Sequence, residues 1–250
     1  MEEEKIPGNA LDIKVLPSEA QHHKCPDMMR KIGLCHPFSA TISGASGSGK
    51  TTFCLNLLTR GDSMYGNYFD EIHLFSLTAR SDSTWKILKL KDEFIHDKAE
   101  KLISDLRVLL SKQKSDVDKR GVLKVKKLCL VFDDVSANRK MLNSSEYMKA
   151  YVQNRHYAIS TIAMVHKYHI QRRICRLNSN HLFIFPATEN EIQKIMSETQ
   201  PAGISKREYH DIIEYCFTPQ GNDHPFMWLN FKVSPDIRIR RNLTEIIRIK

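Results

Sequence analysis

The sequence predicts an α/β fold in which a mainly parallel sheet carries helices on both faces. The first observation is that short apolar runs alternate along the chain with longer segments that repeat apolar residues at helical spacing. The second is that the first of these runs leads through a glycine-rich loop directly into a helical segment. With 250 residues the chain can bury one full core, so we expect a single α/β domain with modest additions.

The chain begins with a polar N-terminal leader, residues 1–36, which contains one weakly strand-like piece at residues 11–16. Histidine and cysteine side chains cluster in this leader, namely His22, His23, Cys25, Cys35 and His36. Their spacing matches no common zinc pattern, so a polar segment is the favoured interpretation and a metal site the alternative. The six cysteines of the chain form no C-x-x-C pair, which indicates free thiols in a reducing compartment.

The predicted core, residues 37–185, opens with a short buried strand over residues 38–43. A helix over residues 52–60 follows, and Gly61 ends it. The loop between them fits the pattern G-x-x-x-x-G-K-[ST] at every fixed position, and its residues are Gly44, Ala45, Ser46, Gly47, Ser48, Gly49, Lys50 and Thr51.

This loop predicts a binding site for the phosphates of a nucleoside triphosphate. Its glycines let successive backbone N–H groups turn inward around the β-phosphate, Lys50 places a charge between the β- and γ-phosphates, and Thr51 supplies a hydroxyl for Mg²⁺. The helix that begins at Thr52 points the partial positive charge of its N-terminus at the same phosphates. A Gly/Ser-rich surface turn is the alternative, but the strand before the loop and the helix after it favour the nucleotide site.

A second strand is predicted over residues 71–77 and an amphipathic helix over residues 97–112, with a charged linker over residues 112–121. The apolar strand over residues 128–132 then ends in two acids, Asp133 and Asp134, which has the form of a Walker B site. Asp133 would hold Mg²⁺, because a hard cation takes oxygen ligands, and Asp134 would act as general base on the attacking water. A turn or a helix cap is the alternative reading of the two acids.

The order of these elements separates classes of nucleotide hydrolase. A full strand–helix unit lies between the phosphate-binding loop and the acidic strand. This order favours the class in which an extra strand is inserted between those two and a second acid activates water. The chain contains no N-K-x-D guanine signature, so we infer ATP as the nucleotide.

The remainder of the core alternates in the same way. A helix over residues 140–153 leads into a buried strand over residues 159–165 with His166 at its tip. A strand over residues 181–185 closes the core. The C-terminal appendage, residues 186–250, belongs to the same domain and has α+β character. Its helices near 189–199 and 206–216 start at expected capping boxes, Thr188 with Glu191 and Ser205 with Glu208, and its strands are expected over 226–233 and 237–239.

The formal net charge of +9 and the isoelectric point near 9.2 permit a polyanionic partner. Lysine and arginine concentrate in three stretches, residues 119–127, 167–176 and 232–250. Solvated loops and strand edges are the alternative for any single stretch. Together with a nucleotide site, the charge favours nucleic acid as the partner.

The motifs taken together resemble a known family. Gly-x-Ser-Gly-Ser-Gly-Lys-Thr, then Phe132-Asp133-Asp134-Val135, then Asn154-Arg155-His156 before the Ser160-Thr161-Ile162 strand are similar to the poxvirus-type genome-packaging ATPases of large DNA viruses and virophages, within the FtsK–HerA superfamily. The resemblance covers about residues 37–185. It implies a RecA-like P-loop NTPase core that binds ATP and Mg²⁺. It also implies a homo-oligomeric ring that pumps double-stranded DNA into a preformed capsid, with a capsid vertex or portal protein as partner.

The resemblance also assigns roles to single residues. Lys50 and Thr51 would contact phosphate and Mg²⁺, Asp133 the metal, and Asp134 would stand where many members of the superfamily have Glu. Arg155 matches an arginine that precedes the sensor strand, a candidate finger inserted into the ATP site of a neighbouring subunit. A surface cation at a helix end is the alternative for Arg155.

One position departs from the family pattern. Where the family usually has Gln at the tip of the sensor strand, this chain has His166, whose charge depends on pH. A histidine that closes a strand without function is the alternative. The segment that follows holds three candidate DNA contacts, Lys167, Arg172 and Arg173, which could couple the γ-phosphate to a moving DNA contact.

The leading hypothesis is therefore an ATP-driven DNA translocase. A nucleotide-dependent switch or a small-molecule kinase is the competing hypothesis, and a capsid or membrane-associated scaffold that only binds ATP is a third. No segment has the apolar length of a membrane span, and the N-terminus is not a secretory signal. We expect the protein inside the cell, in the host cytoplasm or a viral factory, or associated with the virion.

Overall fold

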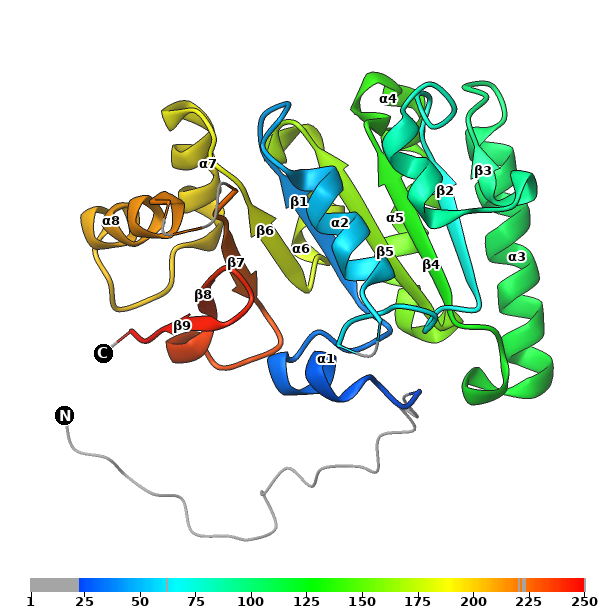
Figure 1. Cartoon of the computed structure of the whole chain (residues 1–250), viewed down its shortest axis with the longest axis horizontal. Helices are drawn as coiled ribbons and strands as arrows, with labels where there is room; N and C mark the ends of the chain where they lie inside the picture. The colour runs from blue at the N-terminus through cyan, green and yellow to red at the C-terminus, as the bar shows by residue number, and fades with distance from the viewer. Residues whose placement is uncertain (1–22, 62, 220, 222–223, 250) are drawn as a thin grey trace, which may run out of the picture.

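The computed structural model describes residues 23–61, 63–219, 221 and 224–249. The strand-like piece expected at residues 11–16 and the side chain of His22 lie outside this range. Within it, the polypeptide forms one continuous nine-stranded sheet with helices on both of its faces (Figure 1). The predicted α/β class is confirmed.

Six parallel strands and three antiparallel strands make up this sheet. The strands run in the order β3-β2-β4-β5-β1-β6-β7-β8-β9, and the antiparallel part begins where β7 pairs with β6. Their bounds are β1 Ser39–Ser43, β2 Glu71–Phe75, β3 Ile95–His96, β4 Leu128–Asp133, β5 Ile159–Val165, β6 His181–Ile184, β7 Met227–Asn230, β8 Ile239–Arg241 and β9 Glu245–Ile247. The C-terminal segment thus widens the sheet of the core.

Strand β5 lies between β1 and β4, so the strand inserted between the phosphate-binding loop and the acidic pair is β5. The register sets Ser43 of β1 opposite Val165 of β5, and Asp133 of β4 opposite Met164 of β5. Because the three strands are parallel, the residues that follow them meet at one edge of the sheet. This arrangement confirms the predicted class of nucleotide hydrolase fold.

Alternate residues of β4 show how helices come to cover both faces. Cys129 and Val131 pack in the same apolar cluster as four buried residues of α2, whereas Leu128, Leu130 and Phe132 pack with α3 and α5. A third cluster lies where α7 and α8 cover β6, β7 and β8. The helices are α1 Asp27–Ile32, α2 Lys50–Thr59, α3 Leu102–Arg120, α4 Arg139–Asn143, α5 Ser145–Val152, α6 Arg173–Leu177, α7 Glu189–Thr199 and α8 Lys206–Phe217, joined in part by short 3₁₀ turns.

Helix α3 differs from its prediction at both ends. The prediction of a charged linker over residues 112–121 is wrong, because α3 continues to Arg120 and stops at Gly121, where φ is +80°. Gln113 holds this part of the helix in place, since its buried amide donates to the carbonyls of Lys126 and Tyr157 at 2.8 Å. The charges that suggested a linker lie on the solvent side of the helix, as the exposed pair Lys114–Asp118 illustrates.

The helix predicted over residues 140–153 is two helices. Ser144 has an extended ψ of 150°, which ends α4, and its hydroxyl accepts from the N–H of Tyr147 to cap α5. Asn138 caps α4 in the same manner through the N–H of Met141. Local side-chain caps have here divided a segment whose apolar spacing is continuous.

The described part of the predicted leader packs on the core. Helix α1 and the residue that follows its cap bury Met29, Ile32 and Leu34 in the cluster that also contains α2. The prediction set the start of the core at residue 37, whereas this apolar packing begins about ten residues earlier. None of the helices in the described residues has the length and apolar character needed to cross a membrane.

The appendage contains the predicted helices, but its strands are shorter and shifted. The expected strand over 226–233 narrows to β7, and the segment near 237–239 opens with a 3₁₀ turn before β8. The capping box of Ser205 and Glu208 forms as predicted. The one expected at Thr188 is wrong, because the Thr188 side chain caps nothing and Glu191 instead accepts from His169.

Candidate nucleotide-binding site

A cleft of about 350 Å³ opens at the edge where β1, β4 and β5 end. The phosphate-binding loop forms one wall, and both acids and the tip of β5 form the other. The residues that line it are Ser46, Gly47, Ser48, Gly49, Lys50, Thr51, Thr52, Thr78, Asp82, Thr84, Asp133, Asp134, Met164, Val165, His166 and His224. The fold thus gathers in one cleft most of the residues predicted from separate motifs.

Glycine is required at two positions of the loop. Gly49 has φ +95° and is the N-cap of α2, so the backbone there is left-handed just where the helix begins. An added Cβ at Gly44 would come within 2.6 Å of Cβ of Phe185, because the loop passes directly over the end of β6. The absence of a side chain at these two positions lets the loop pass close to β6 and turn into α2, whose first residues line the cleft. The N-terminus of a helix in this place suits an anion.

Lys50 is held inside the loop. Its Nζ donates to the carbonyl of Gly44 at 2.9 Å and to that of Ala45 at 2.7 Å, and its residue exposure is 9%. Burial lowers the pKa of Lys50, while the carboxylates of Asp133 and Asp134 act in the opposite direction. The ammonium group is therefore fixed between the loop and the two acids.

Asp133 receives two hydrogen bonds from outside its own strand. Trp85 Nε1 donates to its Oδ2 at 2.9 Å, and the Ser76 hydroxyl donates to the same atom at 3.3 Å. Burial raises the pKa of Asp133, and the bonds from Trp85 and Ser76 lower it. An oriented carboxylate beside the hydroxyl of Thr51 is an oxygen donor set that fits Mg²⁺.

Asp134 and His166 form a pair at the mouth of the cleft. Nε2 of His166 lies 3.2 Å from Oδ1 of Asp134, and the hydroxyl of Ser136 donates to the same oxygen at 3.0 Å. Asp134 has φ +48°, so the chain turns sharply after β4 and aims this carboxylate away from the strand. The carboxylate of Asp134 and the imidazole of His166 thus line the same part of the cleft.

Several residues that line the cleft or bond to its acids were missed by the sequence analysis. Ser76 follows β2, so its place at the carboxyl end of a parallel strand was a usable signal. Trp85 comes from a 3₁₀ turn, η2 Ser83–Leu88, and lies far from Asp133 along the chain, so no sequence pattern links the two residues. His224 lies over Gly49, where an added Cβ would meet the imidazole ring at 2.8 Å, and it too had no motif.

Arg155 lies far from this cleft. It is exposed in the 3₁₀ turn η6 Asn154–Tyr157, just before β5 begins, whereas the cleft lies where β5 ends. A strand of this length places the two roughly 20 Å apart. The arginine therefore cannot reach the phosphate-binding loop of its own chain.

The three candidate DNA contacts follow β5 on the surface. Lys167, Arg172 and Arg173 are all exposed, and Arg172 donates to the carbonyl of Asn143 at 3.2 Å. Gln171, between them, is fully buried and bonds to Thr41 of β1 and to Tyr147 and Tyr151 of α5. The segment is thus anchored at its centre with its positive charges outward.

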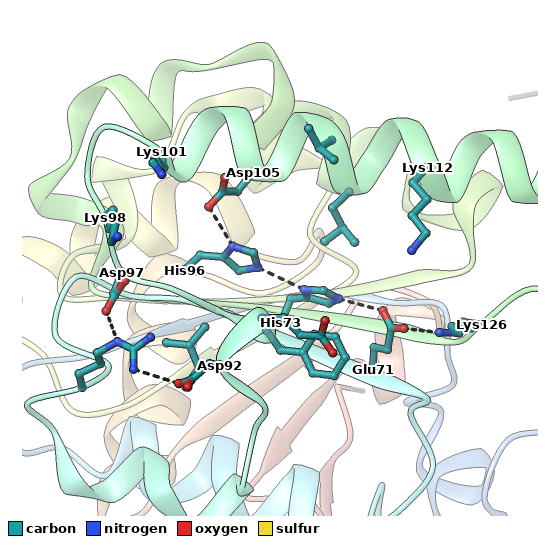
Figure 2. Close-up of a pocket in the computed structure, with 16 residues that line it drawn as sticks. Glu71, His73, Asp92, His96, Asp97, Lys98, Lys101, Asp105, Lys112 and Lys126 are labelled. Carbon is teal, nitrogen blue, oxygen red and sulfur yellow. Dashed lines mark hydrogen bonds and ion pairs between the residues drawn. The ribbon is translucent and has the colours of Figure 1, made fainter.

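A second and larger cleft, of about 680 Å³, lies beside β2, β3 and α3. Figure 2 shows a row of interactions across it, which runs from Asp105 through His96 and His73 to Glu71 and Lys126. This row ties the edge strand β3 to α3, and none of its residues lines the phosphate cleft.

Comparison with known proteins identifies what this arrangement is similar to. The family described as Poxvirus A32 protein matches residues 27–216. No curated protein sequence matches the chain. Among solved structures, B204, the DNA-packaging ATPase from Sulfolobus turreted icosahedral virus, is similar with a TM-score of 0.56 and 16% identity, over 82% of this chain and 97% of that chain.

Two further structures have the same fold. The genome packaging NTPase B204 from Sulfolobus turreted icosahedral virus 2, in complex with AMPPCP, gives a TM-score of 0.53 and 15% identity over 82% of this chain and 96% of that chain. ATPases 2 and 3 of EssC from Geobacillus thermodenitrificans give a TM-score of 0.55 and 13% identity, over 84% of this chain and 39% of that chain. At these identities the likeness is one of fold.

Proposed function

The chain belongs to the poxvirus A32 protein family, and from that premise we propose that it is an ATP-hydrolysing motor that translocates double-stranded DNA into a viral capsid. The observation that carries the proposal is the joint placement of the phosphate-binding loop, Asp133, Asp134 and His166 in one cleft. A loop alone would serve any nucleotide-binding protein. The added acids and sensor residue are the parts that hydrolysis requires.

The residues of the cleft divide the work of hydrolysis. Lys50 and the backbone N–H groups from Gly44 to Thr52 bind the phosphates, and Thr51 and Asp133 would hold Mg²⁺. When bound, the metal supplies positive charge to the β- and γ-phosphate oxygens. Asp134 takes the proton of the attacking water, and His166, 3.2 Å away, orients that carboxylate.

Arg155 completes a site in a neighbouring subunit. Its exposure and its place at the opposite edge of the sheet suit a contact in trans, as in a head-to-tail ring. There it would neutralise charge that develops on the γ-phosphoryl group. Hydrolysis would then depend on assembly.

DNA and capsid contacts are the remaining parts of the proposal. The net charge of +9 favours a polyanion, and Lys167, Arg172 and Arg173 present positive charge next to the sensor residue. Contacts to backbone phosphates would be indifferent to sequence. A capsid vertex or portal protein is the expected protein partner, in the host cytoplasm or viral factory of an infected cell.

The competing hypothesis, a nucleotide-dependent switch or small-molecule kinase, is not favoured. Neither the family nor the excess of positive charge is explained by it. The difference between the two hypotheses lies in the response to DNA.

The test is the steady-state ATPase rate with and without double-stranded DNA, at matched ionic strength. We expect DNA to stimulate the rate several-fold, and Asp134→Asn to abolish both the basal and the stimulated rate while ATP still binds. An assembled protein whose ATPase rate ignores DNA would contradict the translocase and promote the switch or kinase.

A further inference from the structure

An aromatic groove of about 460 Å³ adjoins the phosphate cleft. The two share Gly49, Thr52 and His224, so they are neighbouring parts of one depression. The other residues that line the groove are Phe53, Asn56, Arg60, Met64, Phe185, Phe226, Asn242, Leu243 and Thr244. Its volume is in the range of small-molecule sites.

The first wall of the groove is one face of α2. Phe53 and Asn56 stand at i and i+3 of α2, and Arg60 is the C-cap residue that ends it. These three residues line the groove along the helix whose N-terminus carries the phosphate-binding loop. Asn56 and Arg60 are exposed and Phe53 is half-buried. A ligand with phosphates at the loop would meet this face next.

The second wall comes from the C-terminal half of the sheet. Phe185 follows β6, Phe226 precedes β7, and residues 242–244 form the turn between β8 and β9. The ring of Phe226 lies 4.7 Å from that of Phe53 and 5.1 Å from that of Phe185 between centroids. The appendage thus reaches the side of the phosphate-binding loop only because its strands extend the same sheet.

The groove combines an aromatic floor with a polar rim. Phe185 and Phe226 are buried, at 1% and 6% exposure, and form the floor. On the rim, Nδ2 of Asn56 donates to the carbonyl of Thr52, so the part of this amide that can serve a ligand is the acceptor Oδ1. Oδ1 of Asn242 accepts from the N–H of Phe226, so the part of this amide that can serve a ligand is the donor Nδ2. A flat ring with donors and acceptors at its edge fits this chemistry.

We propose that this groove binds the purine base and ribose of the nucleotide whose phosphates bind residues 44–51, so that the C-terminal appendage is part of the nucleotide site. The proposal rests on the proposed function, because it takes the loop to bind a nucleoside triphosphate. The base packs against Phe53 and the turn at Leu243, with the two asparagine amides at its edge. The loop alone then recognises triphosphate, and the groove adds the preference for a nucleoside.

The test compares two ligands that share the phosphates and differ in the base. Calorimetry gives the Kd of Mg²⁺-ATP and of Mg²⁺-tripolyphosphate for the whole chain. We expect the wild-type protein to bind ATP at least about tenfold more tightly than tripolyphosphate, since base stacking on aromatic side chains contributes that much or more. Asn56→Trp places an indole in the groove from an exposed position, and should remove most of this difference while tripolyphosphate affinity changes less than about twofold.

Thr59→Trp is the matched control, because it adds the same bulk to an exposed position of α2 that does not line the groove. It should leave both affinities unchanged. If the wild-type protein binds tripolyphosphate as tightly as ATP, the groove proposal is overturned and the proposed function stands. If Asn56→Trp weakens both ligands equally, the groove proposal is also overturned. Failure of the wild-type protein to bind either ligand would overturn both proposals.

Discussion

Asp133, the proposed metal ligand, shows how the orientation of a single side chain depends on residues far away in the chain. Its carboxylate is oriented by Trp85, which lies 48 residues earlier, and by Ser76, 57 residues earlier. A carboxylate that must hold a metal at one angle needs such support, because free rotation of its side chain would weaken the site. In the mechanism proposed above, the indole of Trp85 is therefore a positioning group for the carboxylate that would hold the metal.

We expect Trp85→Phe to raise the Mg²⁺ concentration that gives half-maximal ATPase activity by about tenfold, the typical cost of removing a residue that supports a metal ligand. The phenyl ring keeps the packing of the buried indole but cannot donate to Asp133. Magnesium titrations of the steady-state rate measure the effect. Ser76→Ala, which removes a bond of 3.3 Å, should have the smaller effect of the two; a lower maximal rate at unchanged Mg²⁺ dependence would refute this role for Trp85.

Buried histidines predict how stability varies with pH. Burial lowers the pKa of His181 well below its usual range, helped by Lys232 and Arg240, and burial also lowers the pKa of His73 despite its bond to Glu71. The folded chain then binds fewer protons than the unfolded chain below about pH 6.5, so the free energy of unfolding falls as the pH falls through that window. His210, whose pKa Glu189 raises, acts in the opposite direction but is exposed and screened.

We expect the free energy of unfolding to fall by about 1 kcal/mol or more from pH 7.5 to pH 5.5, mainly through His181. Urea unfolding at the two pH values measures it. His181→Leu should reduce this pH dependence, because a side chain of similar size is then buried without a titrating group. An unchanged difference in that variant would show that other groups cause the effect.

The residues of the phosphate-binding loop were predictable because they are contiguous in the sequence, and a contiguous pattern needs no knowledge of the fold. Asp133 and Asp134 were predictable for a similar reason, since they directly follow an apolar strand. Trp85 and His224 were not, because their roles arise only from packing that brings distant segments to one cleft. Arg155 and the DNA contacts stay predictions drawn from the family resemblance.

At the scale of elements, the strands of the core were predicted more closely than the helix ends. The strand predicted over 159–165 coincides with β5, since a buried strand in a parallel sheet is apolar throughout. The ends of α3 and the division between α4 and α5 were missed. The charged residues on the solvent-facing side of α3 have the composition of a linker, so the sequence alone did not show that the helix continues. The cap at Ser144 could not be recognised, because other polar residues near it in the sequence would fit a cap as well.

The two expected capping boxes of the appendage give a matched experiment on helix ends. Ser205→Ala should lower the free energy of unfolding by about 1 kcal/mol, because it removes a hydroxyl that accepts from the N–H of Glu208. Thr188→Ala should change it by less than about 0.5 kcal/mol, since the Thr188 side chain caps nothing. Thermal or chemical unfolding measures the free energy of unfolding of both variants. Equal decreases in the two variants would show that the cap at Ser205 does not stabilise α8.

At the scale of the whole molecule, the cleft lies where the parallel strands end, and Arg155 lies at the other end of these strands, just before β5 begins. The alternation of strands and helices predicted this sheet, and the chain order of the motifs predicted the inserted strand. The sequence analysis did not predict that the appendage adds its strands to the same sheet. The antiparallel pairing of β7 with β6 depends on which outer strand of the core sheet is left unpaired, and that is known only from the fold. The separation of Arg155 from its own cleft leads to a test of assembly.

Mixing two inactive variants should restore activity if Arg155 acts between subunits. Arg155→Ala keeps its own cleft, and Lys50→Ala keeps its arginine, so about a quarter of the interfaces in an equal mixture would pair an intact cleft with an intact arginine. Each variant alone should be at least about a thousandfold slower than the wild type. A mixture of wild type and Lys50→Ala controls for subunit exchange; a mixture of the two variants that stays inactive, although subunits exchange, would place Arg155 outside the reaction.

The outermost strands of the described sheet are very short. β3 has two residues and β9 has three, and they lie at opposite edges of the sheet. Edge strands can cause aggregation, since their unpaired backbone N–H and C=O groups can pair with a strand from another molecule. A very short edge strand offers few such groups. The chain should therefore tolerate the crowding of high-level synthesis without forming sheet-like aggregates, and any assembly it makes would depend on side-chain surfaces that can separate again.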